Sequence, residues 1–185
     1  TPADDAIGYI KKMMSGDVMN IKKIRVDKEG AGMGWGAVYA QYLESMDQIS
    51  GQGNGLSVSR QLYKGDEALN ESAPLKVGDK ITVRLTVKAD RDMDFVQIKD
   101  DRAACMEPLQ AVSGFRWSNG LGYYQATKDA STQFFIDQMR KGTYVIEYQV
   151  YVNRTGEYQA GIATVQSAYA PEFGGHTGGY RVMVE

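Results

Sequence analysis

Cys105 and His176 are the only thiol and the only imidazole in the chain, and such a pair can act as nucleophile and base. His176 lies in the glycine-rich run 174–179, which we interpret as a flexible surface loop. A serine triad lacks the G-x-S-x-G elbow, and a zinc site would need carboxylates to complete its shell. We therefore assign no catalytic residue, and a Cys105–His176 hydrolase stays open as an alternative.

The acidic run Asp90-Arg91-Asp92-Met93-Asp94 has the oxygen spacing with which a calcium loop begins. Phe95 stands where such a loop needs glycine, and Asp101 replaces the bidentate glutamate. We interpret the run as a solvated turn and assign no metal ligand. A weak calcium site of another geometry stays open.

The run Gly32-Met33-Gly34-Trp35-Gly36-Ala37 fits the G-x-G-x-x-A pattern of dinucleotide-binding turns. That pattern needs a strand before it and a helix after it, within a parallel βαβ unit. No such unit is predicted after this run. We therefore expect no cofactor, and we expect a turn in which Trp35 packs over small residues.

Composition limits the classes of partner. The 185 residues are 43% apolar and 24% charged, which suits one ample core, or one domain plus a fragment of another. A formal net charge of −2 gives no general attraction for nucleic acid. No apolar run of about 20 residues is present, so we expect no membrane insertion by this segment. The single cysteine excludes an internal disulfide.

The stretch 75–109 carries the clearest structural pattern. A turn containing Gly78 and Asp79 leads into residues 81–88, where apolar and polar side chains alternate as in a half-buried strand. A charged reversal then leads into a second apolar run, 95–98. We expect these two strands to form a hairpin-like pair.

Further short strands are predicted at regular spacing along the rest of the chain, while 106–122 looks irregular. They are residues 56–62, 123–125, 132–136, 145–152, 158–160 and 180–184. Many short strands separated by turns predict a mainly β protein, an immunoglobulin-like antiparallel sandwich. Gly142 and Tyr144 precede the long strand 145–152, and this spacing is typical of a tyrosine corner, in which the hydroxyl bonds to upstream backbone.

The first fifty residues have a different pattern. Residues 1–14 predict a short N-terminal helix, with Thr1 as its N-cap and Pro2 in its first turn. Residues 19–26 and 35–43 predict strands, although 37–46 also fits a helix. The glycine-rich run 45–55 is the best linker candidate. We therefore divide the chain into residues 1–50 and a main domain of residues 51–185.

The order of several segments resembles the bacterial α2-macroglobulin-like proteins. Residues 34–44 resemble the end of that family's complement-type domain, and the residues after them resemble its carboxy-terminal macroglobulin domain. The matching segments are 56–60, 77–80, 91–96, 107–109, 123–124, 141–144 and 169–172. The resemblance implies a macroglobulin-like sandwich at 51–185, preceded in 1–50 by the tail of the preceding domains.

The resemblance also implies a function. Members of this family are large extracytoplasmic proteins of the periplasm or cell surface that trap proteases, many through an internal thioester formed by Cys-Gly-Glu-Gln. Here Cys105-Met106-Glu107-Pro108 matches only in part, and Pro108 has no side-chain amide to acylate the thiol. The resemblance thus implies a non-catalytic module, with neighbouring domains as partners, proteases as targets of the parent protein, and Gly78, Asp79, Gly142 and Tyr144 as structural residues.

The aromatic content supports a different class of function. Twelve tyrosines, five phenylalanines and two tryptophans, Trp35 and Trp117, could supply a stacking platform for sugars. A surface adhesion or carbohydrate-binding sandwich is therefore the alternative.

Overall fold

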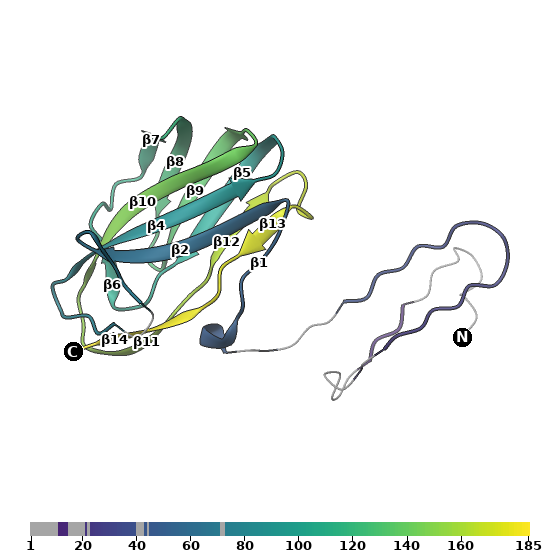
Figure 1. Cartoon of the computed structure of the whole chain (residues 1–185), viewed down its shortest axis with the longest axis horizontal. Helices are drawn as coiled ribbons and strands as arrows, with labels where there is room; N and C mark the ends of the chain where they lie inside the picture. Colours follow the sequence, from purple (N-terminus) through teal and green to yellow (C-terminus); the bar gives the residue numbers. More distant parts are fainter. Residues whose placement is uncertain (1–10, 15–20, 22, 40–42, 44, 71–72) are drawn as a thin grey trace. The chain divides into compact units, whose positions relative to one another are not determined.

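The computed structural model describes residues 11–14, 21, 23–39, 43, 45–70 and 73–185. The chain divides into two compact units, Thr1–Leu43 and Glu44–Glu185 (Figure 1). The described residues of the first unit form neither helix nor strand. Residues 1–10 of the predicted helix lie outside the described residues, and 11–14 are not helical. The predicted strands 19–26 and 35–43 are wrong for every one of their residues that the structure describes.

The second unit begins with a short 3-10 helix, η2 (Met46–Gln48), and is otherwise built from strands. In chain order these are β1 (Gln52–Asn54), β2 (Leu56–Lys64), β3 (Glu67–Ala68), β4 (Lys80–Ala89), β5 (Met93–Asp101), β6 (Met106–Pro108), β7 (Gly114–Ser118), β8 (Leu121–Thr127), β9 (Ser131–Met139), β10 (Gly142–Val152), β11 (Gly156–Ala160), β12 (Ala163–Ser167), β13 (Gly174–His176) and β14 (Tyr180–Val184). The mainly β prediction is confirmed.

The strands form one folded sheet with the order β6-β10-β4-β2-β1-β13-β12-β5-β9-β8-β7, and β3 pairs with β2 beside this path. We call β6-β10-β4-β2 the first layer and β12-β5-β9-β8-β7 the second layer. The short strands β1 and β13 join the layers along one edge (Figure 1). Strands β11 and β14 form a separate antiparallel ribbon, which a parallel bridge between Val184 and Leu75 ties to the sandwich.

Alternation in β4 explains which of its faces is buried. Ile81, Val83, Leu85 and Val87 are each at most 2% exposed, whereas the residues between them reach solvent. The predicted core face of this strand is therefore confirmed. Burying one such aliphatic side chain stabilises the fold by about 1.5–3 kcal/mol.

The predicted hairpin of β4 with β5 is wrong. β4 pairs with β10 and β2 in the first layer, and β5 pairs with β9 and β12 in the second. The reversal between them crosses from one layer to the other: Asp90 N–H donates to Gly55 O, and Lys141 N–H donates to Asp92 Oδ1. Alternation shows which face of a strand is buried, but it does not show which strand lies beside it.

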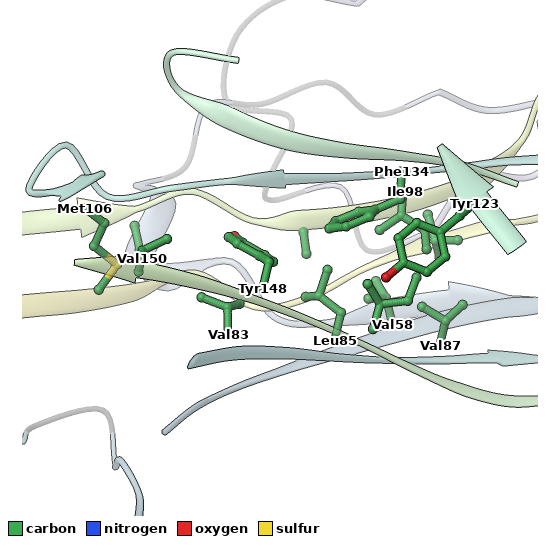
Figure 2. Packing of buried hydrophobic residues seen from close by; sticks show 14 of the residues in the cluster. Val58, Val83, Leu85, Val87, Ile98, Met106, Tyr123, Phe134, Tyr148 and Val150 are labelled. Carbon is green, nitrogen blue, oxygen red and sulfur yellow. The ribbon is translucent and has the colours of Figure 1, made fainter. Parts of the chain in front are cut away.

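Side chains from both layers meet between them (Figure 2). Phe134 of β9 is fully buried and packs against Tyr123 of β8, with ring centroids 5.7 Å apart. Its other neighbour is Tyr148 of β10, in the opposite layer, at 5.9 Å. These aromatic contacts fix the two layers against each other.

Candidate functional site

A polar centre lies buried between the layers. Arg60 of β2 has a side chain only 5% exposed, and that of Asp100 on β5 is 2% exposed. Arg60 Nη1 donates to Asp100 Oδ1, and Tyr148 Oη donates to Asp100 Oδ2 over 2.7 Å. Three strands from both layers thus share one buried ion pair, and we call Arg60, Asp100, Tyr148 and Tyr180 the polar centre.

The remaining donors of Arg60 also find partners. Its Nη2 donates to the Gly161 carbonyl over 2.6 Å, and its guanidinium lies over the Tyr180 ring, 4.6 Å from the centroid. Burial lowers the pKa of Arg60, but the Asp100 carboxylate together with Tyr180 and Tyr148 opposes this effect and leaves the pKa raised. Burial raises the pKa of Asp100, against the opposing pull of Arg60. The space among these side chains leaves no room for a ligand, so the cluster suits structural support rather than catalysis.

Alkaline pH is expected to destabilise the fold through the polar centre. Burial raises the pKa of Tyr180 to about 12, and burial also raises the pKa of Tyr148 well above its ordinary value. In the unfolded chain a phenol ionises near pH 10, so the stabilisation is complete below about pH 10 and is lost as pH rises toward about 12. Thermal melts across this range should show a steep loss of stability, and Tyr148→Phe should make the loss shallower.

A groove of about 330 Å³ opens beside the polar centre. One wall is the stretch 58–62 of β2, and the other is the stretch 177–182, whose last three residues belong to β14. Leu69 and Leu75 line one end of the groove, and Gly51 lines it as well.

The structure places Cys105 and His176 in different surroundings. Cys105 is fully buried, and burial raises the pKa of its thiol, which disfavours the reactive thiolate. His176 is half-buried, and its Nδ1 lies 3.1 Å from its neighbour's carbonyl, Thr177 O. The predicted loop at 174–179 is wrong for 174–176, because β13 there pairs with β1 and β12. No interaction brings the thiol and the imidazole together among the described residues.

Two carboxylates of the acidic turn at 90–94 bond to other groups of the chain. Asp90 pairs with Arg91, whose Nε lies 2.9 Å from Oδ1, and Asp92 accepts the Lys141 N–H over 2.7 Å. Within the described residues, no three His, Cys, Asp or Glu side chains gather as a metal site would require.

Gly78 and Asp79 form the turn before β4. Gly78 has a φ of +92°, and the Asp79 N–H donates to Lys76 O over 3.0 Å. Asp79 Oδ2 accepts from the Lys64 ammonium at 2.7 Å and from the Lys76 N–H at 2.9 Å. The Lys64 hydrogen bond in particular lowers the pKa of Asp79.

Replacing Gly78 by valine is expected to cost about 1–2 kcal/mol, because a β-branched side chain is strained at positive φ. Nothing lies within 4 Å of a Cβ built at this position, so strain of the backbone, and not a clash, causes the loss. Denaturant unfolding should give a smaller loss for Gly78→Asn, since asparagine tolerates this conformation. Equal stability of Gly78→Val and the parent chain would contradict the argument.

Tyr144 makes the corner bond that the sequence pattern predicts. Its hydroxyl donates to the Arg140 carbonyl, four residues upstream, over 3.0 Å. Gly142, in contrast, has no positive φ, and a Cβ there would meet the Tyr144 ring at an ordinary 3.7 Å.

Tyr144→Phe is expected to lower the free energy of unfolding by about 1 kcal/mol, the usual net worth of one hydrogen bond at a partly solvated site. Gly142→Ala is the matched control and should change stability by less. Paired urea titrations measure both values. A loss at Gly142→Ala that exceeds the loss at Tyr144→Phe would argue against the corner.

The two tryptophans are both exposed. Trp35 is 90% exposed, so its predicted packing over small residues is wrong. Trp117 of β7 is 77% exposed and lies beside Phe115 on the outer face of the second layer. Phe115 contacts Tyr124 of β8 edge to face, with centroids 5.1 Å apart. Phe115, Trp117 and Tyr124 form what we call the aromatic face.

The sequence analysis missed the polar centre. A signal was present, because Arg60 falls on the same alternation as Leu56, Val58 and Leu62, all buried or half-buried. Asp100 falls likewise on the alternation of Val96 and Ile98. When two strands each carry a charged residue, of opposite sign, at a position where the alternation calls for a buried apolar side chain, the pattern indicates a buried ion pair.

Comparison with known proteins links the sandwich to one family. Residues 55–172 match the family described as the bacterial alpha-2-macroglobulin MG10 domain. A curated relative, circularly permutated Ras protein 2 of Dictyostelium discoideum, is 29% identical over 138 residues. That alignment covers 71% of this chain and 4% of the relative.

Solved structures share the fold. Native alpha-2-macroglobulin from Escherichia coli, from domain MG7 to the C-terminus, matches with a TM-score of 0.61 at 17% identity, over 73% of this chain and 24% of that chain. The Escherichia coli protein activated by porcine elastase matches with a TM-score of 0.63 at 16% identity, over 74% of this chain and 14% of that chain. Salmonella alpha-2-macroglobulin reacted with methylamine matches with a TM-score of 0.60 at 20% identity, over 73% of this chain and 10% of that chain.

Among the described residues, no helix is long and apolar enough to cross a bilayer. The family match spans most of the sandwich, and the antiparallel fold agrees with it. The chain belongs to the family of the bacterial alpha-2-macroglobulin MG10 domain.

Proposed function

We propose that this chain is a non-catalytic structural and interaction module of a large α2-macroglobulin-like inhibitor. The observation that carries the proposal is the family match over residues 55–172, which runs from the start of β2 to the loop before β13. The solved relatives support a larger parent, because the matching part is 10–24% of their length. The polar centre supports a non-catalytic role, since its charged groups bond to one another.

The intact protein would trap proteases outside the cytoplasm, in the periplasm or at the cell surface. Two Escherichia coli relatives are described as activated by trypsin and by porcine elastase, which supports proteases as targets. Residues 1–50 would then be the tail of the preceding domains, and 51–185 the macroglobulin domain that docks on its neighbours.

A protease-shielding assay on the intact protein tests this role. After incubation with trypsin, the intact protein should shield trypsin from a large protein substrate while leaving it active on a small peptide. Deleting residues 52–185 should reduce this shielding, whereas Phe135→Ala, a change on the sandwich surface, is the control. Full shielding by the deletion variant would overturn the proposed role.

The exposed aromatic face favours a second candidate, a carbohydrate-binding or adhesion module. Phe115 is 82% exposed and Trp117 is 77% exposed, and aromatic rings can stack on sugars. A titration with soluble oligosaccharides, in a Trp35→Phe background, should shift the Trp117 fluorescence if this function holds. An unchanged spectrum would favour the inhibitor module.

A further inference from the structure

The chain contains two Asn-Gly pairs in nearly the same local sequence. One is Asn54-Gly55 and the other is Asn119-Gly120, and in both a small residue precedes the pair and a leucine follows it. The backbone nitrogen of a glycine can attack the side-chain amide of a preceding asparagine with little hindrance, because glycine has no side chain. The two pairs therefore have nearly the same intrinsic reactivity, and any difference between them comes from the fold.

The fold holds the first pair firmly. Asn54 is the last residue of β1, which pairs with β2 on one side and with β13 on the other. Its side-chain Nδ2 donates to the Glu172 carbonyl over 2.8 Å, and the Gly55 carbonyl accepts the Asp90 N–H over 3.0 Å. A Cβ built at Gly55 would lie 2.6 Å from the Phe173 ring, so this ring lies against the glycine. The Asn54 side chain therefore cannot turn toward the Gly55 nitrogen unless several of these contacts break.

The second pair is held more loosely. Asn119 and Gly120 form the two-residue turn between β7 and β8, with φ of +49° and +78°, a conformation for which Asn-Gly is the preferred sequence. Nδ2 of Asn119 lies 3.5 Å from its acceptor, the Val145 carbonyl, and nothing lies within 4 Å of a Cβ built at Gly120. Within the described part of the chain, β7 is the last strand of the sheet, pairs only with β8 and has no buried residue (Figure 1). Local opening of this turn therefore costs little free energy.

We propose that Asn119 is a site of spontaneous deamidation and that the fold protects Asn54 from the same reaction. The Gly120 amide nitrogen loses its proton to solvent and attacks Cγ of Asn119, an N–C bond forms, and the side-chain amide nitrogen leaves as ammonia. Water then adds to one of the two carbonyl carbons of the resulting succinimide ring and breaks its bond to nitrogen, which gives aspartate or isoaspartate. The net change consumes one water and replaces the amide by a carboxylate. This site goes beyond the proposed inhibitor role and does not depend on it.

Deamidation changes the tip of the β7–β8 hairpin, beside the aromatic face. Both products place a carboxylate there, and isoaspartate also adds a carbon atom to the backbone of the turn. Because the length of the turn sets the register of a hairpin, isoaspartate should loosen the pairing of Ser118 with Leu121. The neighbouring Trp117 ring can report this change, since it lies against the backbone at Gly122, where a Cβ would come within 2.7 Å of the ring.

Peptide mapping of the stored 185-residue chain tests the proposal. The folded chain is kept in mildly alkaline buffer, and trypsin then releases Asn54 in the peptide 29–60 and Asn119 in the peptide 117–128. Mass spectrometry should show that Asn119 converts about ten-fold faster than Asn54, which corresponds to roughly 1.4 kcal/mol in the free energy of local opening. In guanidinium chloride the two asparagines should convert at similar rates, because only the fold makes them different.

Asn119→Gln is the control variant, because it keeps an amide at this position but its longer side chain does not readily close the five-membered ring. Conversion of the peptide 117–128 should then be lost, while that of Asn54 stays as slow as before. In a Trp35→Phe background, storage should shift the Trp117 fluorescence of the chain with Asn119 and leave that of Asn119→Gln unchanged. Equal rates at the two asparagines in the folded chain, faster conversion of Asn54, or no conversion of Asn119 while the denatured chain reacts would each overturn the proposal.

Discussion

Asp100→Ala is expected to lower the free energy of unfolding by about 3–5 kcal/mol, because it leaves the Arg60 guanidinium buried without its anionic partner. The Arg60 side chain is only 5% exposed, so water cannot replace the carboxylate. The same change removes the acceptor of the buried Tyr148 hydroxyl. Urea unfolding monitored by circular dichroism measures the loss.

Asp101→Ala is the matched control for Asp100→Ala. Asp101 is the next residue of β5, but it pairs with Lys99 at the surface, where an ion pair is worth about 1 kcal/mol or less. Adding Arg60→Met to Asp100→Ala should recover part of the loss, since the orphaned charge is then removed. Equal effects of Asp100→Ala and Asp101→Ala would refute the buried pair.

Phe134→Ala is expected to destabilise the sandwich by about 3–5 kcal/mol, through lost burial and the cavity left behind. Phe134 is fully buried and contacts rings from both layers, Tyr123 and Tyr148 (Figure 2). The loss should appear as a lower midpoint in both thermal and denaturant unfolding.

Phe135→Ala provides the comparison within the same strand. Phe135 is 39% exposed on the outer face, so its truncation should cost well under half as much as that of Phe134. A reversed order of the two losses would mean that β9 presents its other face to the core.

The sequence predicted elements better than their arrangement. Alternation at 81–88 and 132–136 located β4 and β9, because each has one buried face. β1, β3, β6, β7, β12 and β13 were missed: β7 lies at the sheet edge with no buried residue, and each of the others has at most five residues. Pairing depends on contacts between distant segments, so the layer change after β4 could not be predicted from alternation alone.

The candidate sites divide in the same way. The corner bond of Tyr144 and the positive φ of Gly78 arise from local geometry, so short motifs predicted both. The polar centre needs residues from four strands that are far apart in the chain. The only signal in the sequence was that these polar residues fall at positions where the alternation of their strands predicts a buried side chain. The groove is lined by segments that lie far apart in the chain, so no short motif could predict it.

Hydrogen exchange of the intact protein against the isolated 185-residue chain tests most directly whether this sandwich is a docking module. The account predicts that β4 and β9 exchange equally slowly in both, because the sandwich fold is the same, while surface segments of the sandwich exchange more slowly in the intact protein. Identical exchange at every surface segment would contradict the account, since it would mean that the sandwich contacts no neighbouring domain.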